Sequence, residues 1–296
     1  MVTFRGIKVY YTTVHTALSK SKLPDLDYAL NPYLGCGHGC VYCYARLYTK
    51  DRRASENWGF VVVLKTNIVN VLSREVKKLK PGVVGVGTIT DAYQPVEAVY
   101  KLTSRCLKIL LEHGFRVSIQ TKNPLVLRDL NLLAMRKELV DVGFTITTLN
   151  GKLAEIVEPR SPPPGARVQA LRKLSDLGIK TWIFYGPIVP GLNDDEETVE
   201  RIAKLAHETA STLYYDPLNI KPFMKNPTHP LRGYISMKNT SWWVSVKGTI
   251  LKYCDEYALT CKPGFLGNSE SKCNSPLSSF SHALANSNKR PRQAHR

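Results

Sequence analysis

The chain has 296 residues, of which 43% are hydrophobic and 22% are charged, as in an ordinary globular protein large enough for one large domain or two small ones. No apolar run reaches the ~18–20 residues that span a bilayer, and the N-terminus lacks the apolar core of a signal peptide, so we expect a cytoplasmic protein without a membrane partner. The net charge of +17 is not evenly spread, because residues 262–296 carry +5 and the rest of the chain carries +12. A body that is itself basic suits a polyanionic partner such as nucleic acid, or a lysine-rich surface that binds none.

Apolar, β-rich segments alternate along the chain with amphipathic helical patterns. The strand candidates are Phe60–Leu64, Val83–Gly87, Arg116–Gln120, Val142–Thr148, Thr181–Tyr185 and Leu213–Pro217. The helical candidates between them are Asn67–Leu79, Val96–His113, Leu125–Arg136, Pro163–Leu177 and Asp195–Thr209. Strands that alternate with helices of this length form βαβ units, so the pattern predicts an α/β fold with a parallel sheet, as a partial barrel, a full barrel or an open sheet.

Composition divides the chain further. Residues 1–24 are predicted to be an N-terminal extension, residues 25–218 the core, and residues 219–267 an ordered C-terminal extension. From residue 268 to 296 the sequence is rich in Ser and Asn, with few large apolar residues and a basic end. Such a segment cannot bury enough apolar surface to offset the entropy of ordering, so we expect a disordered basic tail.

Three cysteines lie within eight residues, in the segment NPYLGCGHGCVYCYAR. Cys36, Cys40 and Cys43 have the spacing C-x3-C-x2-C, and glycines lie between and before them. Glycines so closely spaced are costly in a helix but suit a loop that folds tightly around a compact object. Iron–sulfur clusters are normally held by four cysteines. Three thiolates would leave the fourth iron of a [4Fe-4S] cluster open to a small molecule.

A zinc site with His38 as the fourth ligand is the main alternative for this motif. Zinc motifs usually contain two separated pairs of ligands, and no second pair lies nearby in the sequence. Thiols that bind nothing are the less favoured explanation at this density of cysteines.

The motif C-x3-C-x-Tyr-C resembles the signature of the radical S-adenosylmethionine (radical SAM) superfamily. Further segments, TDAYQPVE from Thr90, Thr121-Lys122, Glu158-Pro-Arg160 and PIVPGLND from Pro187, are similar to the spore photoproduct lyase-like branch. The resemblance covers roughly residues 25–210. It implies a partial (β/α)6 TIM-like barrel with a C-terminal extension, and an active site at the C-terminal ends of the strands. It also implies a [4Fe-4S] cluster, S-adenosylmethionine and a 5′-deoxyadenosyl radical.

Candidate site residues follow from the same resemblance. Tyr42 and Tyr44, on either side of Cys43, match tyrosines beside the cofactor and the hydrogen-transfer route. Thr90 and Thr148 match hydroxyl groups that contact the cofactor, and Lys122 matches a lysine that pairs with the methionyl carboxylate.

Two more residues complete this set. Asp91 is expected either to bind the ribose or to cap the helix that follows it. Arg160 is expected to bind the cofactor carboxylate or a substrate phosphate, with a salt bridge to Glu158 or a neighbouring residue as the alternative.

The chain also departs from spore photoproduct lyase. Thr88 stands where that enzyme has a cysteine that donates hydrogen, and a hydroxyl is a far poorer donor than a thiol, so we do not expect the lyase reaction itself. Cys106 is predicted to be a buried apolar residue. In a cytoplasmic chain the other cysteines should be ordinary reduced thiols, with an auxiliary cluster as the alternative for Cys254, Cys261 and Cys273.

The leading function is therefore a radical SAM enzyme that receives single electrons from a ferredoxin- or flavodoxin-type reductant and acts on a nucleic-acid-derived substrate, as in lesion repair or RNA modification. The alternatives are a basic nucleic-acid-binding module with structural zinc and a cluster-bearing electron-transfer or sensing protein. Iron, sulfide and a brown colour would distinguish the first from the zinc module.

Overall fold

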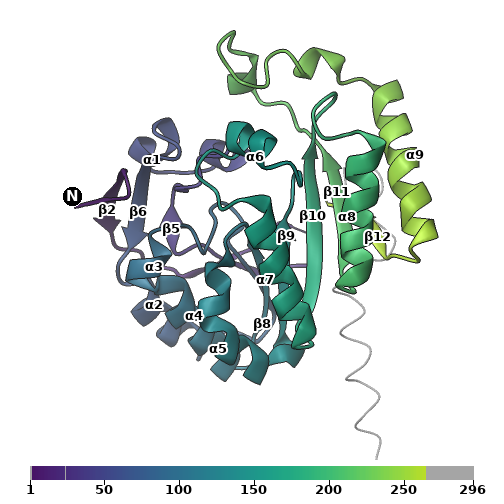
Figure 1. Ribbon diagram of the computed structural model, residues 1–296. Coiled ribbons are helices and arrows are strands. Elements are labelled where there is room, and N and C mark those ends of the chain that lie inside the picture. The colour runs from purple at the N-terminus through teal and green to yellow at the C-terminus, as the bar shows by residue number, and fades with distance from the viewer. Residues whose placement is uncertain (1, 24, 265–296) are drawn as a thin grey trace, which may run out of the picture.

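Six parallel strands form the centre of the computed structural model, which describes residues 2–23 and 25–264 (Figure 1). In chain order and in sheet order they are β4 (Tyr28–Leu30), β7 (Val83–Val86), β8 (Arg116–Thr121), β9 (Val140–Thr145), β10 (Lys180–Ile188) and β11 (Thr212–Pro217). A parallel strand, β12 (Cys261–Pro263), continues the sheet beside β11, and β3 (Leu18–Lys20) runs antiparallel beside β4. These two strands lie at opposite ends of the sheet, which is therefore a partial barrel, and the predicted (β/α)6 architecture is confirmed.

The sequence explains why these strands are central. All six residues of β9 are buried, as expected of a strand with parallel neighbours on both sides and packing on both faces. In β8 and β10 buried and partly exposed residues alternate, so one face packs into the core and the other faces the inside of the barrel.

Helices follow the strands and cover the outside of the sheet (Figure 1). Those between the six barrel strands are the short α1 (Arg52–Glu56), α2 (Ile68–Glu75), α3 (Glu97–Tyr100), α4 (Leu102–Glu112), α5 (Leu130–Met135), α6 (Gly151–Val157), α7 (Pro164–Asp176) and α8 (Glu196–Glu208). The longer α9 (Thr240–Glu256) lies between β11 and β12. Short 3-10 helices are η1 (Tyr44–Leu47), η2 (Pro124–Asp129), η3 (Lys137–Leu139), η4 (Pro222–Lys225) and η5 (Ile235–Met237). No helix in the described part of the chain is both long and apolar enough to cross a membrane.

One predicted strand belongs to a different sheet. The segment predicted as Phe60–Leu64 forms β6 (Val61–Lys65), but β6 pairs with β2 (Ile7–Thr12) and β5 (Tyr33–Leu34), and β1 (Val2–Phe4) completes this second sheet. The first barrel strand is instead the three-residue β4. The residues predicted as an N-terminal extension thus supply strands to both sheets.

The predicted helix Val96–His113 is broken at Lys101, whose φ of +51° places it in the left-handed region. The physical reason is the buried Glu97 carboxylate, which accepts the backbone N–H groups of Thr103 at 2.9 Å and Ser104 at 3.2 Å. Glu97 thereby caps the start of α4, and α3 remains a separate turn.

A disulfide joins Cys254 and Cys261, so the expectation of reduced thiols or an auxiliary cluster at these two residues is wrong. The chain reverses between the end of α9 and β12, and the N–H of Leu259 bonds to the carbonyl of Cys254 at 2.8 Å. This turn brings the two cysteines together. Cys106 is buried and unpaired, as predicted, and Cys273 and the predicted tail lie outside the described residues.

Candidate metal centre and cofactor site

The three cysteines of the motif lie on one tight loop between β5 and η1. Cys36 and Cys40 are buried, Cys43 is partly buried, and none forms a disulfide. Gly35 makes the sharp entry into the loop with a φ of +80°, and a side chain there would come within 2.6 Å of the Val61 carbonyl oxygen. The loop closes on itself through bonds from the Gly39 N–H to the Cys36 carbonyl and from the Cys43 N–H to the Cys40 carbonyl.

Thr90 and Gln94, which follow β7, hold this cysteine loop in place. The Thr90 hydroxyl donates to the Gly35 carbonyl at 2.6 Å and accepts from the Gln94 amide at 2.8 Å. The Gln94 side chain also accepts the Gly37 N–H at 2.8 Å. Thr90 therefore positions the loop, and its predicted contact with a cofactor stays a prediction.

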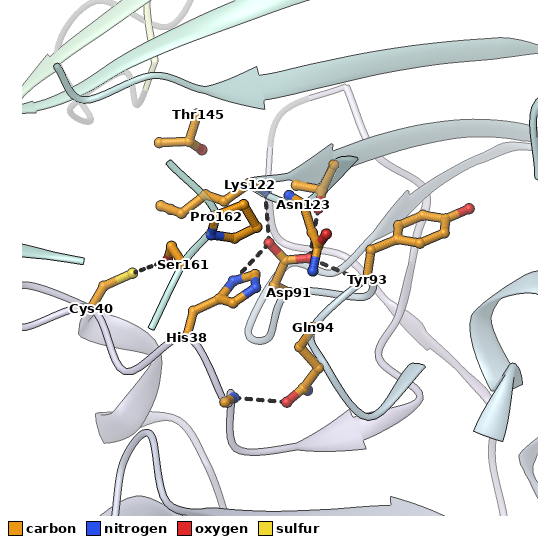
Figure 2. Close-up of polar contacts among 12 residues, drawn as sticks. His38, Cys40, Asp91, Tyr93, Gln94, Lys122, Asn123, Thr145, Ser161 and Pro162 are labelled. Carbon is orange, nitrogen blue, oxygen red and sulfur yellow. Dashed lines mark hydrogen bonds and ion pairs between the residues drawn. The ribbon is translucent and has the colours of Figure 1, made fainter. Parts of the chain in front are cut away.

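The Asp91 carboxylate connects the cysteine loop to the end of β8 (Figure 2). It accepts the Thr121 hydroxyl at 2.7 Å and the backbone N–H groups of Tyr93 at 2.9 Å and Lys122 at 2.8 Å, and it lies 3.2 Å from His38 Nδ1. Burial alone would raise its pKa, but His38 and these donors lower it to about 2. Asp91 is thus a fixed anion in the framework of the site, and a bond to ribose stays a prediction.

A buried charge cluster lies beside the loop. Glu158 is 2% exposed, and its two carboxylate oxygens are shared among Tyr42, Thr147 and Arg167. The Tyr42 hydroxyl donates to one oxygen, and the Arg167 guanidinium pairs with the other. Burial raises the pKa of Glu158, but Arg167 and Lys122 outweigh it and hold the pKa below its usual range. The carboxylate is therefore ionised.

Lys122 is the surplus cation of this cluster. Its Nζ lies 4.0 Å from Glu158 Oε1, too long for a hydrogen bond, while Arg167 neutralises the same carboxylate more closely. The Lys122 side chain is only 15% exposed and lies against the Tyr42 ring, with Nζ 5.7 Å from the ring centroid. Burial lowers its pKa, but the neighbouring Cys40 and Glu158 raise it above the usual range. A buried ammonium with one distant partner is suited to bind a further anion.

The two tyrosines next to Cys43 bond to different partners. Tyr42 bonds to Glu158, and burial together with that carboxylate raises its pKa well above the ordinary value, so the phenol stays protonated. The Tyr44 hydroxyl donates to the backbone carbonyl of Thr88 at 3.1 Å. The structure thus brings Tyr42 together with Lys122, and places Tyr44 over the end of β7.

Thr148 and Arg160 are not part of the charge cluster. Thr148 is buried and accepts the Asn150 N–H at 3.0 Å, at the start of α6. Arg160 donates to the Arg5 carbonyl at 2.8 Å and stacks over the exposed Phe60 ring at 4.8 Å. The alternative pairing of Arg160 with Glu158 is wrong, because Arg167 pairs with that carboxylate. The cofactor contacts of Thr148 and Arg160 stay predictions.

Sequence reasoning missed three of the buried residues that organise this site, namely Gln94, Thr147 and Arg167. Arg167 lies within the amphipathic α7, where a charged residue is normally exposed. The only signal was its position on the apolar face of that helix, one turn before Leu171 and two turns before Leu174, both buried.

The donor set fits an iron–sulfur cluster better than a zinc ion. Burial raises the pKa of Cys40 to about 11 and that of Cys43 to about 12, so these thiols would ionise only with compensation such as a bound metal ion of either kind. Zinc needs its ligands on one ion, but within residues 2–23 and 25–264 no three His, Cys, Asp or Glu side chains are placed to hold a single metal ion. A cubane takes a single cysteine per iron, so its thiolates do not have to meet at one point.

Comparison with known proteins identifies a family model and several relatives that match this sequence. The family model described as the Radical SAM superfamily matches residues 30–206. An uncharacterized protein of Methanocaldococcus jannaschii, MJ0683, is 33% identical over 247 residues, which cover 83% of this chain and 90% of that protein. The uncharacterized protein Rv2578c of Mycobacterium tuberculosis is 32% identical over 209 residues, covering 67% of this chain and 61% of that protein.

Solved structures show the same fold at low identity. Spore photoproduct lyase complexed with dinucleoside spore photoproduct has a TM-score of 0.67 at 14% identity, over 88% of this chain and 82% of that one. A radical SAM methyltransferase from Sphaerobacter thermophilus has a TM-score of 0.52 at 17% identity, over 81% of this chain and 66% of that one.

Proposed function

The chain belongs to the radical SAM superfamily of enzymes, and we propose that it holds a [4Fe-4S] cluster at Cys36, Cys40 and Cys43 and cleaves S-adenosylmethionine reductively. When bound, the cluster supplies the electron that splits the sulfonium into methionine and a 5′-deoxyadenosyl radical. The observation that carries this proposal is the combination on one side of the barrel of three unpaired cysteines and the surplus buried cation Lys122.

The protein side chains have separate tasks in this proposal. Lys122 binds the methionyl carboxylate as a buried point charge, because its nearest carboxylate, Glu158, lies 4.0 Å away. Tyr42 stays protonated and keeps its ring beside the Lys122 ammonium group. Asp91, Thr90 and Gln94 fix the loop, so the site is organised before the cofactor binds.

For the substrate we propose a nucleic acid or a nucleotide-derived molecule. The excess of 41 Lys and Arg over 24 Asp and Glu supports a polyanionic partner. The structurally similar lyase binds a dinucleoside photoproduct, which adds support by analogy. Thr88, whose hydroxyl accepts from the Asn31 amide at 3.0 Å, replaces that enzyme's thiol, so the reaction differs after hydrogen abstraction. A ferredoxin- or flavodoxin-type protein supplies the electrons.

Two assays test these statements separately. The anaerobically reconstituted enzyme, reduced with dithionite, should contain iron and sulfide and convert S-adenosylmethionine to methionine and 5′-deoxyadenosine, slowly even without substrate. Labelled DNA and RNA should bind the full chain with an affinity that falls steeply with salt, because Lys and Arg release condensed counterions. If the enzyme cleaves S-adenosylmethionine but does not bind nucleic acid even at low salt, the proposed enzyme class stands and the proposed substrate is wrong.

A further inference from the structure

Few buried side-chain nitrogen and oxygen atoms in the described residues lack a hydrogen-bond partner. Of the five such side-chain atoms, Glu158 Oε2 and Arg167 Nη2 face each other as an ion pair, and His38 Nδ1 lies 3.2 Å from the Asp91 carboxylate. Two nitrogens remain, His38 Nε2 and the indole Nε1 of Trp58. His38 lies within the cysteine loop itself, whereas Trp58 approaches the loop from the turn between α1 and β6.

Trp58 is fixed against the cysteines. The residue is 9% exposed and packs with Cys36 and Ala45, and Cys43 lies against the same cluster. The adjacent Gly59 has a φ of +91°, and a side chain there would come within 2.8 Å of the Gly39 Cα atom. This backbone contact brings the turn between α1 and β6 directly onto the cysteine loop and places the indole beside it.

An indole N–H can only donate a hydrogen bond, and leaving it buried without an acceptor costs about 1–3 kcal/mol. None of the described protein atoms accepts it. The sulfurs of an iron–sulfur cluster and its thiolates are negatively charged acceptors, and hydrogen bonds to them are among the factors that set the reduction potential. A cluster on this loop would supply the acceptor that the N–H of Trp58 lacks.

We propose that Trp58 donates its indole N–H to a sulfur of the cluster or of its cysteine thiolates and thereby raises the reduction potential. The inference rests on the proposed function, because it requires the cluster. The reduced cluster carries one more negative charge than the oxidised one, so the bond is stronger in the reduced state. Trp58 thus makes the cluster easier to reduce.

The test uses the full chain with its reconstituted cluster and tryptophan labelled with ¹⁵N at the indole nitrogen. Pulsed EPR of the reduced cluster should show a ¹⁵N coupling in the wild-type protein. Trp58→Phe, which keeps an aromatic ring but removes the donor, should abolish the coupling and shift the midpoint potential to a more negative value. Trp242→Phe is the matched control, because the Trp242 N–H bonds to Asp194 at 2.6 Å, and it should leave both readouts unchanged.

A coupling that survives in Trp58→Phe, or a midpoint potential that does not move, overturns the proposal. If Trp58→Phe takes up no cluster, the labelled wild-type protein is tested instead, and the absence of any indole coupling there overturns the proposal. The chain has four tryptophans, so a coupling that is retained in each of Trp182→Phe, Trp242→Phe and Trp243→Phe comes from Trp58 and supports the proposal. A wild-type chain that binds no iron and sulfide would instead refute the proposed function, so the two failures are distinguishable.

Discussion

Replacing Lys122 by methionine removes the buried ammonium but keeps an unbranched side chain of similar length. Glu158 keeps Arg167 as its close partner, so no buried charge is left unpaired, and the fold and the cluster should survive. The substitution therefore removes only the bond between the protein and the cofactor carboxylate. A hydrogen bond between charged groups contributes about 1.5–3 kcal/mol, which corresponds to roughly 10- to 150-fold weaker binding of S-adenosylmethionine.

Anaerobic equilibrium titration of the reconstituted variant measures this loss directly, and the iron–sulfur absorbance reports retention of the cluster. Lys108→Met is the control, because Lys108 is exposed and lies 3.9 Å from Glu112 on the surface of α4. Wild-type affinity in Lys122→Met with the cluster intact would refute the assignment of Lys122 as the carboxylate partner.

Three further predictions follow from the same contacts. Alanine at Cys36, Cys40 or Cys43 should abolish iron content and cofactor cleavage, whereas Cys261→Ala should retain both, and equal iron loss in Cys261→Ala would contradict the assignment. Arg167→Met should lower the free energy of unfolding, measured by urea denaturation, by about 3 kcal/mol, because the buried Glu158 loses its close partner. Arg172→Met, which removes an exposed pair with Glu208, is the control and should lower it by less than ~1 kcal/mol. The Asp91 pKa of about 2 lies below its ordinary value, so the ionised carboxylate stabilises the fold above about pH 4, and this contribution is lost as the pH falls toward 2. Between about pH 5 and about pH 2 the cluster-free wild-type protein should therefore lose roughly 2 kcal/mol more stability than Asp91→Asn. Equal losses of the two proteins in acid denaturation would exclude this role.

Local patterns predicted the parts of the fold that depend on neighbouring residues. The alternation of strands and helices predicted the parallel sheet, and the cysteine spacing with its glycines predicted a tight loop, which the left-handed Gly35 and Gly39 confirm. The three-residue strand β4 was too short to give a pattern. The membership of β6 in the second sheet depends on its pairing with Lys8 and its neighbours, far away in sequence.

The organisation of the site was harder to predict for a related reason. Glu158 and Arg167 form an ion pair between a loop and a helix, and sequence shows the two charges but not their burial. The Glu-Pro-Arg motif predicted Arg160 as a site residue, but Arg160 stacks on Phe60, and the partner of Glu158 is Arg167. The disulfide was missed because the expected compartment favours reduced thiols, and that expectation concerned the environment rather than the geometry of the chain.

The most direct test of the central claim is a single anaerobic assay of the reconstituted chain with S-adenosylmethionine and dithionite. The account predicts a brown protein that contains iron and sulfide and releases methionine and 5′-deoxyadenosine in equal amounts, with no release by the Cys40→Ala variant. A colourless protein that holds zinc, or a brown one that leaves S-adenosylmethionine intact, would contradict it.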